Sequence, residues 1–386
     1  MSKANWDQVQ LYFSGDDYFR DVIKSIENAQ SEIWVESYIF DMDPIGLRVL
    51  NALAEARARG IRVHILVDGV GSFNWLVSLR QFCKKNHLLL RIYHPMPFKA
   101  QYLLKISWKS LRRILFLLKR MNKRNHRKVF LIDNDHAFLG SLNVSQVHTK
   151  EFLLTKAWRD TRLRVAGPPI SILREACQRT WSKSKFAGLS FSTSFIKRKS
   201  PRLRKRSSQY LRLNSNLRWR YSLLRDFNNR LKAAKERILV TNAYFLPRRS
   251  VLRALIKAAK RGIYVGLCLP AVSDILIVQW ASRSLYRRLL KAGVHVFEYQ
   301  GKVMHAKTLI VDQWATVGSH NLNHRSLTHD LEVEVVLDQP VHLLALTQQW
   351  EKDLRSCHEV TMNDLGKMRW YHRVFGRFCY WFRYWL

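Results

Sequence analysis

The chain has 386 residues, 47% of them hydrophobic, which is enough for one large or two medium domains and excludes a disordered protein. Its 66 Lys and Arg outnumber 29 Asp and Glu, which gives a net charge of +37. Such an excess favours a polyanionic partner, either nucleic acid or an anionic membrane surface.

Cysteine usage and hydropathy restrict the cellular setting. The five cysteines are scattered without Cys-x-x-Cys spacing, which argues against a disulfide framework or a zinc site and favours a reducing compartment. The first residues lack the apolar segment of a secretory signal, and no apolar run reaches the length of a membrane span. We therefore expect any membrane contact to be peripheral.

The first half of the chain has the pattern of a βαβ unit. A strand is predicted over 33–40, an amphipathic helix ends at Gly60, and a second strand covers 61–67. Another helix and the strand in LLLRIYHP follow. The second half repeats this order, with strands over 238–245 and 263–269, a helix that ends at Gly262, and a later strand in GVHVFEYQ. Each half is thus expected to hold a parallel or mixed sheet flanked by helices.

The pattern His-x-Lys-x4-Asp follows in each half, beside strands predicted over 129–132 and 308–311. Its members are His126, Lys128 and Asp133 in HRKVFLID, and His305, Lys307 and Asp312 in HAKTLIVD. Each copy is followed by Gly-Ser-x-Asn, with Ser141 and Asn143 in one half and Ser319 and Asn321 in the other. Two copies with the same trailing signature indicate two half-sites that hold one phosphate.

A site with two histidines and two lysines supplies what phosphodiester chemistry needs. One imidazole attacks phosphorus to form a phosphohistidine, while the other protonates the leaving alcohol and then deprotonates the incoming one. The lysines bind the non-bridging oxygens, and the asparagines and serines are expected to contact the same substrate. This chemistry needs no metal and no cofactor.

Carboxylates are expected to orient the histidines. Asp160 and Glu332 are the candidates, each about thirty residues beyond the histidine of its own half. Asp133 and Asp312 complete the catalytic motif, but a carboxylate at the phosphate would repel it. We therefore expect these two to be buried and to fix the turn after the strand.

The other histidines and the cysteines are expected to have structural roles. We interpret Cys268 as a small core residue. The histidines expected to be structural or at the surface include His64, His136, His148, His320 and His324.

Composition divides the chain into four parts: a first half (1–185), a basic linker or exposed loop (186–215), a second half (216–364), and an aromatic and basic tail (365–386). The segment LLKISWKSLRRILFLLKRMNKRN and the tail are both amphipathic and basic. Each suits a bilayer interface, and the alternative is an ordinary helix packed on the core.

These residues resemble the phospholipase D superfamily, and the stretches NAYFLPRRSVLRALIKAAKRGI and HAKTLIVDQWATVGSHNLN resemble bacterial cardiolipin synthases of the short B type. The resemblance implies an α/β fold of two similar α/β/α halves about a pseudo-twofold axis, with the active site between them. It implies phosphatidyl transfer between two phosphatidylglycerol molecules with release of glycerol, and weakly favours His126 as the nucleophile.

Other functions remain open from the sequence: a phospholipid hydrolase, a superfamily nuclease, or an inert binding module. The resemblance implies anionic phospholipids, namely phosphatidylglycerol and cardiolipin, as partners, and makes nucleic acid a poor candidate. It also implies a peripheral position on the cytoplasmic face of the bacterial inner membrane.

Overall fold

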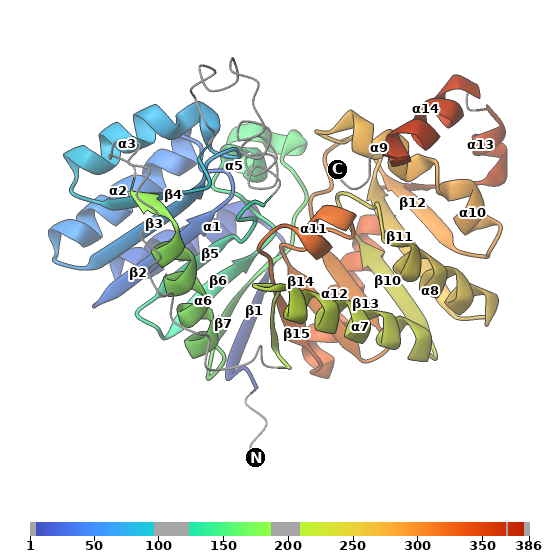
Figure 1. Cartoon of the computed structure of the whole chain (residues 1–386), viewed down its shortest axis with the longest axis horizontal. Helices are drawn as coiled ribbons and strands as arrows, with labels where there is room; N and C mark the ends of the chain where they lie inside the picture. The colour runs from blue at the N-terminus through green and yellow to red at the C-terminus, as the bar shows by residue number, and fades with distance from the viewer. Residues whose placement is uncertain (1–4, 96–122, 187–208, 368–369, 382–386) are drawn as a thin grey trace, which may run out of the picture.

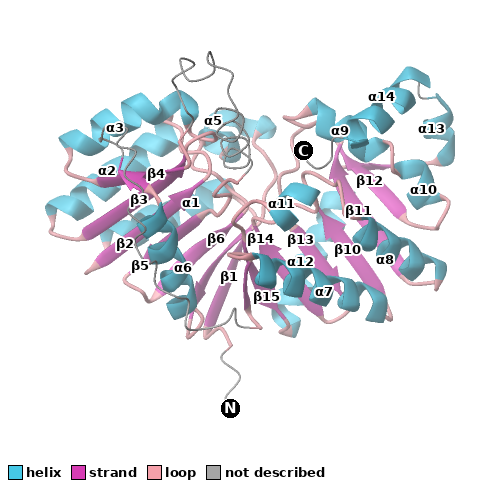
Figure 2. Ribbon diagram, in the orientation of Figure 1, coloured by secondary structure: helices cyan, strands magenta, loops and turns pink. Residues whose placement is uncertain are grey.

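The computed structural model describes residues 5–95, 123–186, 209–367 and 370–381. Two mixed sheets of eight strands each stand side by side, and helices cover their outer faces (Figures 1 and 2). None of the helices in these ranges has the length and apolarity needed to cross a bilayer.

The first sheet belongs to the first half of the chain. Its elements are β1 (Gln8–Tyr12), α1 (Gly15–Glu27), β2 (Glu32–Ser37), α2 (Pro44–Ala58), β3 (Arg62–Asp68), η1 (Phe73–Trp75), α3 (Leu76–Lys85), β4 (Leu89–Tyr93), β5 (Val129–Ile132), β6 (His136–Gly140), η3 (Gln146–His148), α5 (Lys150–Leu153), η4 (Leu154–Lys156), β7 (Arg162–Ala166), α6 (Ile170–Lys183) and β8 (Lys185–Phe186).

The second half builds the second sheet. Its elements are β9 (Leu211–Leu213), α7 (Leu217–Ala233), β10 (Arg237–Thr241), α8 (Arg249–Lys260), β11 (Tyr264–Pro270), α9 (Leu276–Arg283), α10 (Tyr286–Leu290), β12 (His295–Tyr299), β13 (Thr308–Val311), β14 (Trp314–Gly318), α11 (His324–Thr328), β15 (Val333–Leu337), α12 (Pro340–Leu354), β16 (Cys357–Glu359), α13 (Met362–Lys367) and α14 (Trp370–Trp381).

The two sheets have matching strand orders. The first runs β1-β7-β6-β5-β2-β3-β4-β8, and the second, read from its other end, runs β9-β15-β14-β13-β10-β11-β12-β16. In each, the βαβ strands are parallel and the remaining pairs are antiparallel. The predicted fold of two similar α/β halves is therefore confirmed.

The local predictions hold closely. The strands β5 and β13 occupy the predicted ranges, and α2 and α8 end two residues before Gly60 and Gly262. Both glycines have positive φ, +91° and +87°, which a side chain would resist. Some boundaries are wrong: β2 ends at Ser37 and β10 at Thr241, short of the predicted residues 40 and 245. In addition, β9 lies inside the range assigned to the linker and pairs with β15, so the second half begins before residue 216. The amphipathic segment at 103–122, most of the linker and the end of the tail lie outside the described residues.

A continuous hydrophobic core joins the halves. It combines Trp34, Leu131 and Leu163 of the first sheet with Leu211 and Val317 of the second. Backbone bridges between Asn125 and Leu331 and between Arg159 and Met304 close the seam at the ends of the strands. The first residues of both His-Lys motifs lie beside these bridges, so the packing of the halves positions both motifs.

Candidate active site

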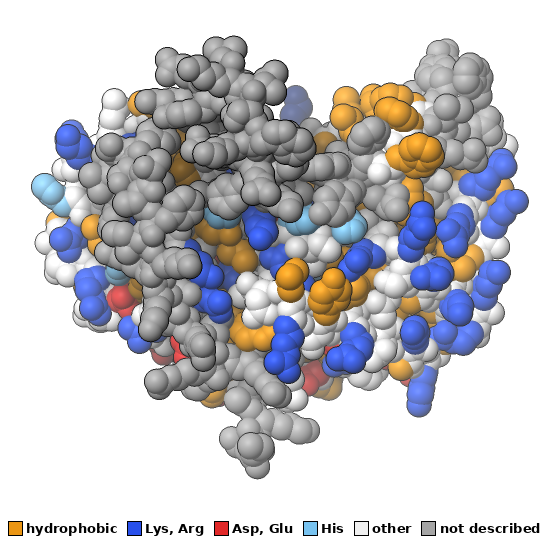
Figure 3. All heavy atoms as spheres, viewed as in Figure 1, with side chains coloured by type: hydrophobic (Ala, Val, Ile, Leu, Met, Phe, Trp, Pro, Cys, Tyr) orange, Lys and Arg blue, Asp and Glu red, His pale blue; other side chains and the backbone are white. Residues whose placement is uncertain are grey.

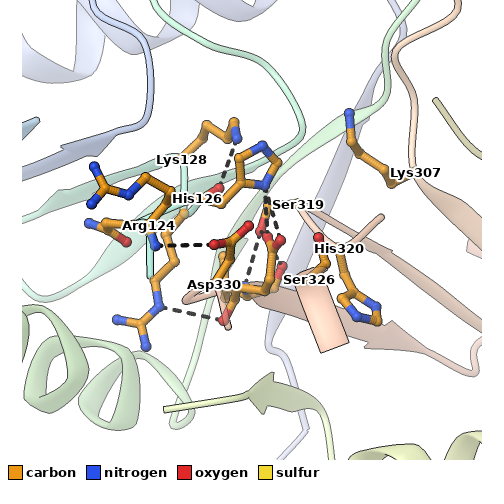
Figure 4. Close-up of polar contacts among 12 residues, drawn as sticks. Arg124, His126, Lys128, Lys307, Ser319, His320, Ser326 and Asp330 are labelled. Carbon is orange, nitrogen blue, oxygen red and sulfur yellow. Dashed lines mark hydrogen bonds and ion pairs between the residues drawn. The ribbon is translucent and has the colours of Figure 1, made fainter. Parts of the chain in front are cut away.

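His126 and Lys128 lie just before β5, on the chain that bridges to the second half. The His126 N–H donates to the Leu331 carbonyl at 3.0 Å, and the Lys128 ammonium donates to the His126 carbonyl at 2.8 Å (Figure 4). Both side chains are buried, at 8% and 2% exposed. The lysine therefore folds back over its own motif.

His305 and Lys307 repeat this arrangement before β13. The His305 N–H donates to the Arg159 carbonyl at 2.8 Å, and the Lys307 ammonium donates to the His305 carbonyl at 2.6 Å. The structure thus brings all four residues of the predicted pairs to the seam, where the histidine N–H of each pair is anchored to the opposite half.

The orienting carboxylates are present but cross between the halves. His126 Nδ1 lies 3.0 and 3.1 Å from the two carboxylate oxygens of Glu332, and His305 Nδ1 lies 3.0 Å from Asp160 Oδ2. The prediction paired each carboxylate with the histidine of its own half, and that pairing is wrong. Engagement of Nδ1 leaves Nε2 of each ring for a reacting group.

The hydroxyl groups of the two serines contact the orienting carboxylates. Ser141 donates to Asp160 and Ser319 donates to Glu332, and both hydroxyls are fully buried. These contacts favour a role in fixing the carboxylates, and binding of substrate by the serines stays a prediction. Each half supplies a serine and a carboxylate that orient the histidine of the other.

Both asparagines are buried, at 5% and 2% exposed. Asn143 Oδ1 accepts from the Ile39 N–H at 3.3 Å, so its amide NH₂ points to other partners. Asn321 is 2% exposed and its Oδ1 has no hydrogen-bond partner among the described residues. Their binding of substrate stays a prediction.

The motif aspartates lie at the far end of their strands. Asp133 accepts the backbone N–H groups of Gln30, Ser31 and Glu32 at 2.7–3.0 Å. Asp312 accepts those of residues 235–237 at 2.9–3.0 Å. A strand of four residues separates each aspartate from its lysine, so their Cα atoms are about 16 Å apart at ~3.3 Å per residue over five steps. These contacts support the expected structural role. The expected burial is wrong, because both side chains are partly exposed, and a catalytic role for either stays a prediction.

Two tyrosines that the sequence reasoning missed stand over the site. The Lys128 ammonium lies 5.3 Å from the Tyr38 ring centre, and the Lys307 ammonium lies 5.8 Å from that of Tyr244. The same rings lie 5.0 Å from His126 and 6.4 Å from His305. The repeat itself could have indicated these tyrosines, because SYIF and NAYF occupy the same place in the two halves.

A buried ionic network, also missed, fixes the chain before His126. Asp68 accepts the Asn125 N–H at 2.9 Å and contacts the Arg124 guanidinium at 3.3 Å, while Asp330 accepts the Arg124 N–H at 3.1 Å (Figure 4). Arg124 and Asp68 are at most 1% exposed. The network holds this segment between the halves.

Burial and mutual repulsion shift the basic groups of the site. Burial and the neighbouring Lys128 hold the pKa of His126 well below its usual range, and burial and Lys307 lower the pKa of His305 against the effect of Asp160. Burial lowers the pKa of Lys128 to about 7 and that of Lys307 to about 8. An anion that enters the site would relieve this repulsion.

The two carboxylates differ in their surroundings. Burial opposes ionisation of Asp160, yet the hydrogen bond from His305 and the charges of His305 and Arg162 hold its pKa well below the usual range. Burial raises the pKa of Glu332, with Lys128 opposing. His148, fully buried, places Nδ1 3.5 Å from Asp160, whereas the residue at the same distance after Gly318 is Ser326, which hydrogen-bonds Glu332.

The imidazole and carboxylate atoms of His148, Asp160 and His305 lie within 4.8 Å of one another, the kind of grouping that can hold a metal ion. Asp160 already accepts hydrogen bonds from Ser141 and His305. A metal there would compete with the contact that orients His305. Hydrogen bonds connect only Asp160 and His305 of the three, because neither ring nitrogen of His148 has a hydrogen-bond partner among the described residues. The sequence predicted a structural or surface role for His148.

The fold and the paired His-Lys motifs define a phospholipase D-like site made by two halves. The family described as "Cardiolipin synthase, PLD-like domain" matches residues 22–151 and 227–357, and the chain belongs to this family. Both matched segments include one His-Lys pair.

Curated relatives agree along nearly the whole chain. The chain is 30% identical over 383 residues to cardiolipin synthase B of Salmonella typhimurium, covering 96% of this chain and 87% of that protein. It is 29% identical to cardiolipin synthase B of Escherichia coli K12 with the same coverage. The recognised family and the transferase class are thereby confirmed.

Solved structures support the fold alone. Phosphatidylserine synthase of Haemophilus influenzae superposes with a TM-score of 0.68 at 14% identity, over 92% of this chain and 88% of that one. Polyphosphate kinase of Porphyromonas gingivalis superposes with a TM-score of 0.59 at 15% identity, over 92% of this chain and 49% of that one.

Proposed function

We propose that this cardiolipin synthase family member transfers a phosphatidyl group from one phosphatidylglycerol to the terminal hydroxyl of another, forming cardiolipin and releasing glycerol. The observation that carries the proposal is the crossed pairing, in which each imidazole is held through Nδ1 by a carboxylate of the other half. Both Nε2 atoms are then free to act on one phosphodiester.

In this mechanism His126 is the nucleophile. Its pKa, held well below the usual range, keeps the ring neutral at physiological pH, as attack on phosphorus requires. Nε2 attacks phosphorus, the bond to the glycerol oxygen breaks, and a phosphatidyl-histidine remains. Lys128 and Lys307 neutralise the non-bridging oxygens as charge builds up.

His305 is the general acid and then the general base. The ionised Asp160 stabilises a proton on this ring, which passes from Nε2 to the departing glycerol. His305 then takes the proton of the second phosphatidylglycerol hydroxyl, whose oxygen attacks phosphorus and releases His126. Atoms balance as two phosphatidylglycerols giving one cardiolipin and one glycerol.

We also propose that the enzyme works as a peripheral protein at the cytoplasmic face of an anionic membrane. The net charge of +37 supports attraction to anionic headgroups. Nucleic acid is a poorer partner, because the family's named activity is lipid synthesis.

The test is incubation of the purified protein with phosphatidylglycerol vesicles, followed by lipid and glycerol analysis. We expect cardiolipin and glycerol in equal amounts, and a loss of at least about 10⁴-fold in His126→Ala and His305→Ala. Absence of cardiolipin from the wild type contradicts the proposal, and phosphatidic acid as the main product indicates a hydrolase instead.

A second measurement separates the roles of the histidines. With a phosphatidyl ester of p-nitrophenol, which leaves without protonation, His305→Ala is expected to accumulate the covalent adduct, because no base activates the acceptor. His126→Ala is expected to form none. Mass spectrometry of the quenched proteins detects the adduct, and adduct on His305 in the His126 variant would reverse the assignment.

A further inference from the structure

Exposed apolar side chains gather beside the site in the second half, on α9, the residue before it and α14. We call this group the α9–α14 ridge; it consists of Ile275, Leu276, Ile277, Phe375, Phe378 and Trp381. Their exposed fractions run from 42% to 80%. Figure 3 shows hydrophobic side chains grouped over these helices at the upper right. Contiguous apolar surface of this kind marks an interaction site.

Close packing of α14 against α9 supports the ridge. Gly376 lets α14 approach α9 closely, because a Cβ there would lie 2.6 Å from the Trp280 carbonyl oxygen. Cys379 is 3% exposed and packs with Val278 and Ala281 of α9. Phe375, at 5.0 Å from the Trp280 ring, continues the contact. The helix is thus fixed by one face while its aromatic rings, spaced by three residues, stay in solvent.

The base of the ridge reaches the site directly. Tyr244 packs against the small cluster that contains Cys379, and its hydroxyl donates to Asp274, just before the ridge, at 2.6 and 2.8 Å. The same ring lies near His305 and Lys307. One side chain therefore separates the ridge from the phosphate-binding residues.

The first half carries a smaller counterpart on η1 and the start of α3. Phe73, Trp75 and Val77 are 38%, 37% and 66% exposed. The neighbouring Ser72 hydroxyl donates to the Tyr38 carbonyl and accepts from the Phe40 N–H, both at 3.0 Å. Tyr38 covers the first His-Lys pair as Tyr244 covers the second, and in Figure 1 α3 and α9 lie along the same edge of the molecule. Apolar groups therefore flank the site on both sides.

The charge of this region favours an anionic bilayer as the binding partner of the ridge. Residues 237–297, which include α9, contain eleven Lys and Arg and a single carboxylate, Asp274. Two chains of charge +37 repel each other, which disfavours a second copy as the occupant. An anionic bilayer attracts the cations and accepts the apolar side chains in its interface.

We propose that the α9–α14 ridge, helped by the η1 side chains, inserts into the interface of a bilayer that contains anionic phospholipid and so sets the site against the headgroups. The inference deepens the proposed function and rests on it for the identity of the lipid. It explains how diester phosphates reach two buried His-Lys pairs while the acyl chains stay in the membrane.

The test is flotation of the full chain with vesicles of phosphatidylglycerol and phosphatidylethanolamine, and with vesicles of phosphatidylcholine alone. The variants are Leu276→Ser with Ile277→Ser, and Phe375→Ser with Phe378→Ser. The matched control is Val341→Ser with Leu344→Ser on α12, where the wild-type side chains are 64% and 58% exposed. Thermal unfolding shows that each variant is folded.

We expect the ridge variants to bind anionic vesicles at least about tenfold more weakly than the wild type, and the control to bind like the wild type. Equal binding by ridge and control variants overturns the proposal, as does a wild type that forms dimers through the ridge in light scattering. Cardiolipin is scored separately: ridge-dependent binding without cardiolipin contradicts the function and leaves the docking surface standing.

Discussion

The two half-sites hold their histidines in the same way but surround them with different charges. Each imidazole meets a carboxylate that a buried serine fixes from the other half. Behind Asp160 lie a second imidazole, His148, and the buried Arg162. Behind Glu332 lies Ser326, and the position matching Arg162 is Glu334, which pairs with Arg212 at 3.3 Å.

The difference shows how a repeated unit can divide two chemical roles. Both halves share the contact between a carboxylate and the Nδ1 atom of the histidine, which leaves two equivalent Nε2 atoms for one phosphate. The neighbours of Asp160 outweigh its burial and hold its pKa well below the usual range, whereas burial outweighs the neighbours of Glu332 and raises its pKa. A proton is consequently stabilised more on His305 than on His126, without any change in the motif itself.

The largest difference between the two half-sites is expected when each orienting carboxylate is replaced by its amide. Asp160→Asn is expected to lower turnover of phosphatidylglycerol about 10³-fold, because His305 loses the charge that stabilises its proton. With the p-nitrophenol ester as donor and water as acceptor, adduct formation by this variant should recover about a hundredfold, since that leaving group needs no acid. Burst kinetics measure the adduct step.

The matched variant for that experiment is Glu332→Gln. It is expected to slow attack by His126 with both donors alike, because the orientation of the nucleophile matters whatever group departs. Equal recovery in the two variants would show that the half-sites are interchangeable and would break the comparison.

A smaller effect is expected from pH. Burial lowers the pKa of Lys128 to about 7 and that of Lys307 to about 8, and each lysine is charged only below its pKa. We therefore expect kcat/KM to fall about tenfold or more as pH rises from about 7 to about 9, with Lys128 losing its proton first. In Lys128→Arg the guanidinium stays charged, so the fall should begin at higher pH. A flat profile for the wild type contradicts this.

The smallest effect on turnover is expected from the motif aspartates, which make the same backbone contacts in both halves. Asp133→Ala and Asp312→Ala each strip acceptors from three backbone N–H groups, so each is expected to cost about 1–2 kcal/mol of folding free energy. Turnover per folded molecule should stay within about twofold, because neither carboxylate is at the site. Chemical denaturation and rate measurements check this, and a hundredfold loss of turnover at full stability would return the aspartates to the catalytic set.

Most of the fold follows from local patterns. Hydrophobic periodicity predicts the βαβ strands and the strands after each His-Lys pair. The glycines predict the helix ends. The edge strands were harder: β9 has three residues beside a basic stretch, and only pairing with β15 makes it a strand. Such tertiary pairing leaves no periodic signal in so short a segment.

The site was predictable in its members but not in its connections. Repetition of the motif marked the histidines and lysines, and the distance to the next strand marked Asp160 and Glu332. Sequence separation could not show that the carboxylates cross, because that contact exists only once the halves pack. Sequence separation also could not show that the serine hydroxyls contact these carboxylates, or that His148 lies beside Asp160.

The crossed contacts make catalytic competence a property of the assembled pair. Opening the seam between Asn125 and Leu331 by a few ångströms would release both imidazoles at once, since each would lose the carboxylate that holds its Nδ1 from the other half. Each half alone would lack the carboxylate that orients its histidine. Turnover is therefore expected to report whether the two halves are packed together, even when the damage lies far from the phosphate.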